Sequence, residues 1–190
     1  MPTFLSDPPQ WLYLVLGGFV VITGAITTRK QDRRAVIPFG VAALLLLVVF
    51  LIDRFFESPR EEASRRVFMM SLAADAKNPD AFVEHLADKV EIQSKPATRE
   101  EVRKSGFWQL LRQWEVHVAV WNFSRDDVNV IDDNTVEIGF MAKGESGSKQ
   151  VPVYGRATFK KQSDGSFKLT AFKATDPMNR TNTVDIPNFP

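Results

Sequence analysis

Two long runs without a single charged residue lie near the N-terminus of this chain. Residues 11–28 (WLYLVLGGFVVITGAITT) and residues 35–52 (AVIPFGVAALLLLVVFLI) contain no Asp, Glu, Lys or Arg. Crossing the hydrocarbon core of a bilayer takes about 20 predominantly apolar residues, and one charge at its centre costs roughly 2.5–3.5 kcal/mol. The runs therefore predict two membrane-spanning helices within residues 1–56.

The connection between the two runs, residues 29–34 (RKQDRR), is short enough to make them an antiparallel hairpin in the lipid bilayer. Four of its six residues are basic, whereas the first ten residues of the chain contain no Lys or Arg. The positive-inside rule then puts the 29–34 loop in the cytoplasm and the soluble part on the extracytoplasmic side. Several arginines follow the second run and weaken this asymmetry: Arg54, Arg60, Arg65 and Arg66.

Two alternatives compete with a hairpin anchor. A cleaved signal peptide needs a positively charged start, which MPTFLSDPPQ lacks, and Trp11 and Tyr13 are typical of a lipid–water boundary. Two buried helices of a soluble core would each show a polar stripe, and neither run has one. The sequence favours an uncleaved, two-span integral membrane protein.

The remaining 134 residues have an ordinary polar composition. They hold 19 Lys and Arg against 20 Asp and Glu, so they give no reason to expect a nucleic-acid partner. Their number suits one packed domain. The chain has no cysteine, which excludes disulfides, thiol nucleophiles and cysteine metal sites. No histidine or carboxylate spacing indicates a metal, and we expect no cofactor.

The soluble part changes its hydrophobic period once. Ser58-Pro59-Arg60-Glu61, Asn78-Pro79 and Thr98-Arg99-Glu100-Glu101 are helix start signals, and a short strand is expected at residues 88–94. The period then becomes two, which predicts strands at 115–130, 135–143, 150–162 and 166–175 that pair as antiparallel hairpins. Residues 144–149 (GESGSK) are expected to form a flexible loop. Residues 177–190 contain prolines and no periodicity, which predicts an irregular or loosely packed tail.

This order of elements resembles the nuclear-transport-factor-2-like superfamily, also described as SnoaL-like or cystatin-like. The resemblance covers about residues 57–176 and rests on SP.EEA….FM..LAA, D.V.I…PATREEV and the closing VYGRATFKKQSDGSFKLTAF. It implies an α+β cone, in which three helices pack on a curved, mostly antiparallel sheet and leave a pocket. Its members include isomerases, dehydratases, transport scaffolds and assembly modules, so the resemblance does not fix a function.

One register of the predicted strands is almost wholly apolar. It contains Val118, Phe140, Ala157 and Leu169 among others, and its only polar members, Asn122 and Lys173, stand near strand ends. If this face meets the helices, the pocket has no acid–base equipment, and Asn122 and Lys173 are its rim candidates. A bulge in the strand at 115–130 would exchange the two registers locally.

The other register mixes aromatic and charged residues. This composition suits either a solvated face or a face that a second copy of the chain covers, as in a homodimer. The interaction candidates on this face are His117, Trp121, Tyr154, Arg156 and Phe172.

Two functions remain open at this stage. One is a membrane-anchored, non-enzymatic module that binds an apolar ligand or an envelope protein partner. The other is a membrane-tethered isomerase- or hydrolase-like enzyme that acts on an apolar substrate. A carboxylate in the pocket, such as Glu91 or Glu115, with a raised pKa would favour the enzyme. The second histidine, His85, is expected at the surface or at the boundary of the core.

Overall fold

The computed structural model describes residues 10–30, 33–55 and 58–190. The chain divides into two compact units, Met1–Ser58 and Pro59–Pro190. Gln31 and Asp32 of the predicted connector lie outside the described residues, as does the predicted boundary between anchor and soluble part at residues 56–57.

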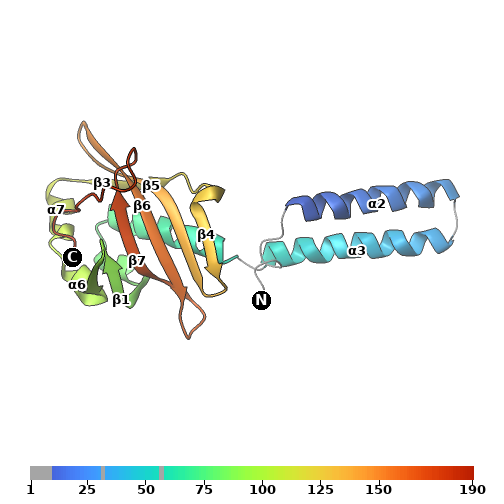
Figure 1. Cartoon of the computed structure of the whole chain (residues 1–190), viewed down its shortest axis with the longest axis horizontal. Helices are drawn as coiled ribbons and strands as arrows, with labels where there is room; N and C mark the ends of the chain where they lie inside the picture. Colours follow the sequence, from blue (N-terminus) through green and yellow to red (C-terminus); the bar gives the residue numbers. More distant parts are fainter. Residues whose placement is uncertain (1–9, 31–32, 56–57) are drawn as a thin grey trace. The chain divides into compact units, whose positions relative to one another are not determined.

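The described part of the first unit consists of two helices, α2 (Gln10–Lys30) and α3 (Arg33–Phe55). They lie side by side (Figure 1). The helices approach closely at Gly24, where a Cβ atom would lie 3.3 Å from a ring carbon of Phe39. A small residue at this position allows the backbone of α2 to approach the neighbouring aromatic side chain.

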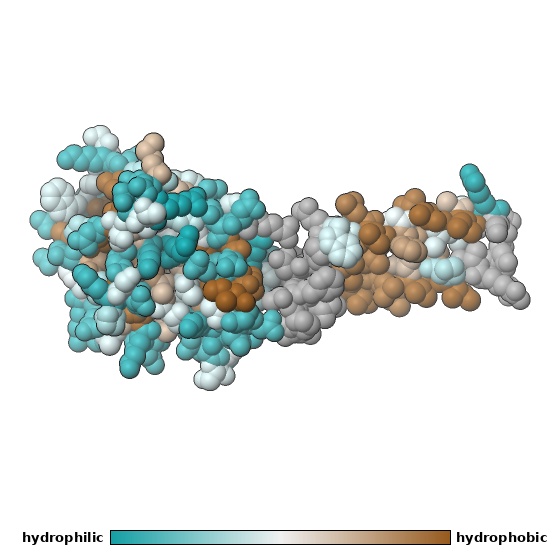
Figure 2. All heavy atoms as spheres, viewed as in Figure 1, coloured by the Kyte–Doolittle hydropathy of each residue, from teal (hydrophilic) through white to brown (hydrophobic). Residues whose placement is uncertain are grey.

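Apolar side chains cover α2 and α3 on the visible face in Figure 2. Leu14 is 77% exposed and Val21 71%, unlike the side chains of a helix in a soluble core. One stretch, Trp11–Arg29 in α2, is long and apolar enough to cross a membrane. The apolar stretch Val36–Leu51 in α3 is shorter. Within the described residues, α2 is therefore the one helix long and apolar enough to cross a membrane.

The second unit begins with the predicted helices. Helix α4 (Pro59–Asp75) carries Glu61 and Glu62 in its first turn, and α5 (Pro79–Val83) is capped by Asn78, whose Oδ1 accepts from the Ala81 N–H. The third predicted helix is split at Ser105 and Gly106 into α6 (Arg99–Lys104) and α7 (Phe107–Gln113).

The predicted capping box at the start of α6 is confirmed. The Thr98 Oγ1 accepts from the Glu101 N–H at 3.2 Å, and the Glu101 carboxylate accepts from the Thr98 N–H at 2.7 Å. Two of the otherwise unpaired N–H groups at this helix start are thereby satisfied.

Seven strands form one sheet that α4 crosses on one face (Figure 1). Its order is β2-β1-β7-β6-β5-β3, and β4 also pairs with β5. All pairs are antiparallel except β1 with β7. The strands are β1 (Leu86–Ile92), β2 (Lys95–Thr98), β3 (His117–Trp121), β4 (Val128–Asp132), β5 (Thr135–Ser146), β6 (Lys149–Lys161) and β7 (Phe167–Thr175). This is the expected α+β arrangement of a curved, mostly antiparallel sheet with helices.

The strand expected at 115–130 is two strands. Asn122 has a φ of 58°, and a 3₁₀ turn η1 (Arg125–Asp127) follows before β4 begins. Asparagine adopts this left-handed conformation more readily than most residues, so it can end β3 here. Both strands pair with β5, and the expected bulge is instead a complete interruption.

The prediction of a flexible loop at 144–149 is wrong, because β5 extends to Ser146 and β6 begins at Lys149. Ser146 pairs with Lys149 across a two-residue turn in which Gly147 has a φ of 58°. Glycine accepts a positive φ without a steric cost, so the hairpin closes tightly.

A bulge in β7 changes which residues of the strand face the helices and which face outward. Phe159 pairs with Leu169 but Thr158 pairs with Ala171, so Thr170 is the extra residue, and its hydroxyl donates to the Thr158 carbonyl at 3.1 Å. Beyond this point Phe172 pairs with Ala157 on the helix-facing side. Lys173 pairs with Arg156 and points to the opposite face.

The main core lies between the sheet and the helices. Alternate residues of β5 to β7 are buried there together with residues of α4 and β1. Gly155 of β6 belongs to this face, because a Cβ on it would lie 2.7 Å from the ring of Phe140 on β5. The ring of Phe140 fills the space that the missing side chain leaves.

We predict that Gly155→Ala lowers the free energy of unfolding by about 1–3 kcal/mol, because the new methyl group overlaps the Phe140 ring. Urea titration followed by circular dichroism measures the loss. The cost should shrink in a Phe140→Leu background. Gly144→Ala is the matched control on β5, since its Cβ meets only Val116, at 3.4 Å. Equal losses at the two glycines would contradict the argument.

Candidate functional site: an apolar cavity under the sheet

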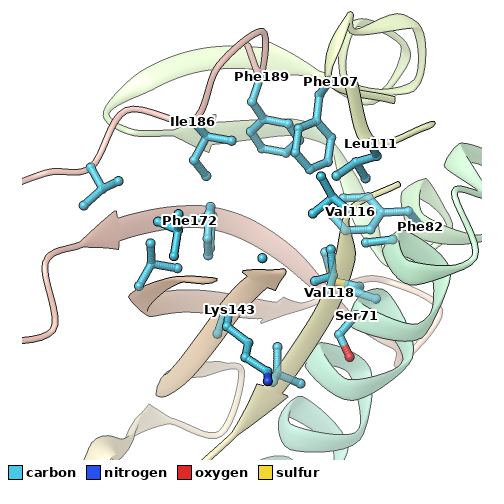
Figure 3. A pocket seen from close by; sticks show the side chains of 18 of the residues that line it. Ser71, Phe82, Phe107, Leu111, Val116, Val118, Lys143, Phe172, Ile186 and Phe189 are labelled. Carbon is cyan, nitrogen blue, oxygen red and sulfur yellow. The ribbon is translucent and has the colours of Figure 1, made fainter. Parts of the chain in front are cut away.

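A cavity of about 670 Å³ lies between the sheet and the helices of the second unit. This volume falls within the range of small-molecule sites. Figure 3 shows side chains from the strands, the helices and the C-terminal segment around one space. The sheet, the helices and the C-terminal segment thus each form part of the cavity wall.

The sheet supplies the widest wall. Most of its residues come from the alternating register that the sequence predicted, with Phe172 added by the β7 bulge. The Phe172 and Phe140 ring centroids are 6.4 Å apart. The strand residues on this wall with apolar side chains are Leu86, Ile92, Val118, Val120, Phe140, Ala142, Val151, Val153, Ala157, Leu169 and Phe172.

The helices form the opposite wall. Val67, Met70 and Ala74 of α4 line it together with Leu110 and Leu111 of α7. An aromatic cluster fixes the position of α7. Trp108 packs edge-on against Phe82 and Phe107, with centroids 5.3 and 5.4 Å away, and its indole N–H donates to the Val102 carbonyl at 2.8 Å. Edge-to-face contacts of this kind hold a helix in one orientation.

The C-terminal segment is the third wall: it is irregular, as the sequence predicted, but it packs against the domain. Apart from one isolated bridge it is irregular, but Val184, Ile186 and Phe189 line the cavity. Phe189 packs against Phe107 with a centroid distance of 4.9 Å. The side chain of Gln93 donates to the Val184 carbonyl at 2.6 Å and accepts from the Ala174 N–H at 3.2 Å.

The few polar side chains on the cavity are occupied elsewhere or stand at its edge. Ser71 donates to the Phe68 carbonyl at 2.8 Å, Ser146 donates to the Trp114 carbonyl, and the Lys143 ammonium lies 2.9 Å from the Glu145 carboxylate. Lys149 and Asp185 are both exposed. The interior therefore offers a ligand almost no hydrogen-bonding group.

The cavity opens to solvent between the end of α7 and the β5–β6 hairpin. Trp114 and Val151 line it there and are 61% and 59% exposed. Asp185 and Pro187 of the C-terminal segment are also exposed lining residues, on the rim formed by that segment. We call this opening the mouth of the cavity.

Acid–base groups are not gathered at this site. Asp185 is the single carboxylate among the lining residues of the described chain, and no histidine or tyrosine lines the cavity. Glu91 and Glu115 are exposed and do not line it. No group of three His, Asp or Glu side chains within the described ranges could hold a metal ion.

The two rim candidates from the sequence are not cavity residues. Asn122 is an exposed turn residue that ends β3, and Lys173 points away from the cavity because of the bulge at Thr170. Phe172, expected on the outer face, lines the cavity for the same reason. The sequence also missed the three apolar side chains of the C-terminal segment.

The remaining outer-face candidates have different surroundings. His117 Nδ1 lies 3.1 Å from the Asp75 carboxylate, which also accepts from the Val118 N–H, and that backbone bond is the largest cause of the lowered pKa of Asp75. A guanidinium nitrogen of Arg156 lies 3.7 Å from a carboxylate oxygen of Glu137 on the neighbouring strand. Trp121 is 41% exposed.

Tyr154 is buried in a small polar cluster on the outer face. Its hydroxyl donates to Asp127 at 3.0 Å, and the Arg180 guanidinium stacks 3.9 Å from its ring centroid and donates to the same carboxylate. Burial, and then the hydrogen bond to Asp127, raises the pKa of Tyr154. Arg180 thereby ties the C-terminal segment to the outer face of the sheet. Homodimerisation through this face stays a prediction.

Solved structures with the nuclear-transport-factor-2-like or cystatin-like fold resemble the second unit. A domain of unknown function with a cystatin-like fold from Nostoc punctiforme PCC 73102 has a TM-score of 0.51 at 11% identity, covering 64% of this chain and 80% of that one. A protein from Shewanella frigidimarina NCIMB 400 named "putative ketosteroid isomerase" has a TM-score of 0.50 at 14% identity, covering 60% and 94%.

An NTF-2 like protein of unknown function from Shewanella oneidensis MR-1 covers 62% of this chain and 99% of that one, with 8% identity and a TM-score of 0.47. No protein-family model and no curated protein matches the sequence. At these identities the likeness is one of fold, and the predicted cone fold of the second unit is confirmed.

His85 gives a pH-dependent prediction for this domain. Burial, with the positive charges of Arg66 and Lys168 nearby, lowers the pKa of His85. The unfolded chain then binds this proton more readily than the folded one, so stability falls as the pH drops through about 6.5, the ordinary histidine pKa.

We therefore expect His85→Gln to lose less stability than the wild type between pH 7.5 and pH 5.5, measured by urea midpoints. An unchanged pH dependence in His85→Gln would count against the buried, neutral imidazole.

Proposed function

We propose that this protein is a membrane-held binding module whose cone domain takes up an apolar ligand. The observation that carries the proposal is the lining of the 670 Å³ cavity, whose interior walls are aliphatic and aromatic side chains. Pockets of this composition hold ligands by burying apolar surface, and each buried CH₂ group contributes about 0.8 kcal/mol.

Catalysis has less support at this site. General acid–base chemistry needs a titratable group within hydrogen-bond reach of the reacting atom. Asp185 is exposed on the rim, and the hydroxyls and the ammonium named above already have partners. The isomerase- or hydrolase-like alternative therefore has no observation in its favour within the described part of the chain.

The anchor is proposed to be a two-span hairpin. Both helices of the first unit are apolar around most of their surface, which suits a lipid surrounding rather than water. The hydroxyls of Thr23 and Thr27 donate to carbonyls one turn earlier, at 2.6 and 2.8 Å, so these polar groups are satisfied within the helix. Such internal pairing is what the bilayer interior demands.

The ligand proposal can be tested by contact quenching of tryptophan. In a full-length Trp11→Phe, Trp121→Phe background, the remaining tryptophans are Trp108 and Trp114, and Trp114 lines the cavity. We expect 9,10-dibromostearate to quench the fluorescence of this protein in phosphatidylcholine nanodiscs. Ala142→Phe, which fills the cavity, should weaken the quencher's affinity about tenfold or more, the equivalent of about 1.4 kcal/mol.

The matched control is Ala171→Phe, which adds the same ring on the opposite face of the same sheet, where Ala171 pairs with Thr158 and neither residue lines the cavity. It should leave quenching unchanged. Equal effects of the two substitutions, or no saturable quenching at all, would sink the proposal.

Topology can be tested with single cysteines, because the chain has none of its own. We expect Ser148→Cys, in the exposed β5–β6 turn, and Gln31→Cys, in the basic connector, to react with an impermeant maleimide from opposite sides of the membrane. The expected outcome is labelling of Ser148→Cys in intact cells and of Gln31→Cys only after permeabilisation. The reverse pattern would invert the orientation, and labelling of both from one side would refute the proposed topology.

A further inference from the structure

The C-terminal strap, residues 177–190, differs from the other walls of the cavity in how it is held. The strands are fixed by ladders of hydrogen bonds, and the helices by buried side chains. The strap has no regular secondary structure beyond one isolated bridge, between Thr183 and Thr175.

Contacts at three places hold the strap: on the outer face, in the middle, where the Val184 N–H donates to the Ala174 carbonyl at 2.9 Å, and at the far end. On the outer face, Arg180 stacks on Tyr154 and donates to Asp127. Also in the middle, the side-chain amide of Gln93 at the sheet edge donates to the Val184 carbonyl. At the far end the Asn188 carbonyl accepts from the Phe107 N–H at 3.1 Å.

The apolar side of the strap occupies space that a ligand would use. Ile186 and Phe189 point toward the same cavity as Phe172 in Figure 3. Asp185 and Pro187 are exposed beside them, so the strap is an inner wall and also one rim of the mouth. Moving it outward widens the mouth and enlarges the cavity, and neither step disturbs the sheet.

We propose that the C-terminal strap is the gate of the cavity, and that a ligand enters and leaves when Phe189 and Ile186 swing away from α7 and the sheet. This inference rests on the proposed ligand-binding function. The inner end of the strap is the moving part, and the Arg180 contacts on the outer face retain its base.

The chain offers a direct way to lock the gate. A Cβ atom built on Gly106 would lie 3.3 Å from the Cβ of Asn188, close to the separation that a disulfide requires. Gly106 has a φ of −63°, which a cysteine adopts readily, whereas Asn188 has a φ of 57°, a left-handed conformation that a cysteine adopts less readily than an asparagine. Because the natural chain has no cysteine, Gly106→Cys/Asn188→Cys can form one intramolecular bond only.

The experiment measures release of 9,10-dibromostearate from the full chain in nanodiscs, in the Trp11→Phe, Trp121→Phe background. The loaded protein is mixed rapidly with excess phosphatidylcholine vesicles, and the recovery of tryptophan fluorescence gives the release rate. Oxidation of the double-cysteine variant should slow release about tenfold or more, and reduction of the same sample should restore it. Each single-cysteine variant should not respond to oxidation.

A second pair of variants tests the opposite direction. Phe189→Ala removes the inner contact with Phe107 and should speed release several-fold. Met178→Ala lies in the same strap, at a side chain that is 99% exposed, and should leave the rate unchanged.

The outcomes separate the gate from the binding function. Saturable quenching with equal release rates in the oxidised and reduced forms overturns the gate while the binding module stands. Failure of the two cysteines to form a bond overturns the placement of the strap against α7. Absence of saturable quenching in the reduced form overturns the binding function and the gate with it.

Discussion

The long strands β5, β6 and β7 carry aliphatic and aromatic side chains on one face, and this face must be covered. Its other side is charged and solvated, so the sheet cannot be turned over. Helix α4 packs across strands β3, β5 and β7, and α7 ends beside the β5–β6 hairpin, where the Ser146 hydroxyl donates to the Trp114 carbonyl. Near the β5–β6 turn, Val151 and Val153 of β6 are more exposed than the buried residues further along the strand. The cavity is the space that remains between this apolar face and the helices, and the C-terminal segment closes part of it.

The sequence predicted the order of elements well because the signals are local. Asn78 and Thr98 act at helix starts through their own side chains, and alternation along β5 and β6 follows from which residues are apolar. The break between α6 and α7 also has a local signal, Ser105-Gly106, which the helical pattern of the neighbouring apolar residues obscured.

The predictions that failed concern features that depend on contacts between distant segments of the chain. The bulge at Thr170 is set by the Thr158 carbonyl on the neighbouring strand, and a β-branched threonine in a strand gives no local hint of it. This one residue moves Phe172 into the cavity and Lys173 out of it. The C-terminal segment did carry a signal, Val184 and Ile186 around Asp185, but the nearby prolines favoured an irregular tail. Its packing against Phe107 depends on α7, which is about 80 residues earlier in the chain.

An apolar cavity whose few polar side chains have partners or stand at its edge has a physical consequence of its own. Water gains little inside it, because a buried water needs two to four polar partners and the walls supply almost none. Side chains that face such a space lose dispersion contacts that they would make in a filled core. An apolar occupant restores those contacts and stabilises the folded domain by mass action. Since the strap is held by few and separate contacts, the same domain can admit that occupant without unfolding its sheet. A lipid surface nearby would supply molecules of this chemistry at high local concentration, which links the proposed anchor to the proposed site.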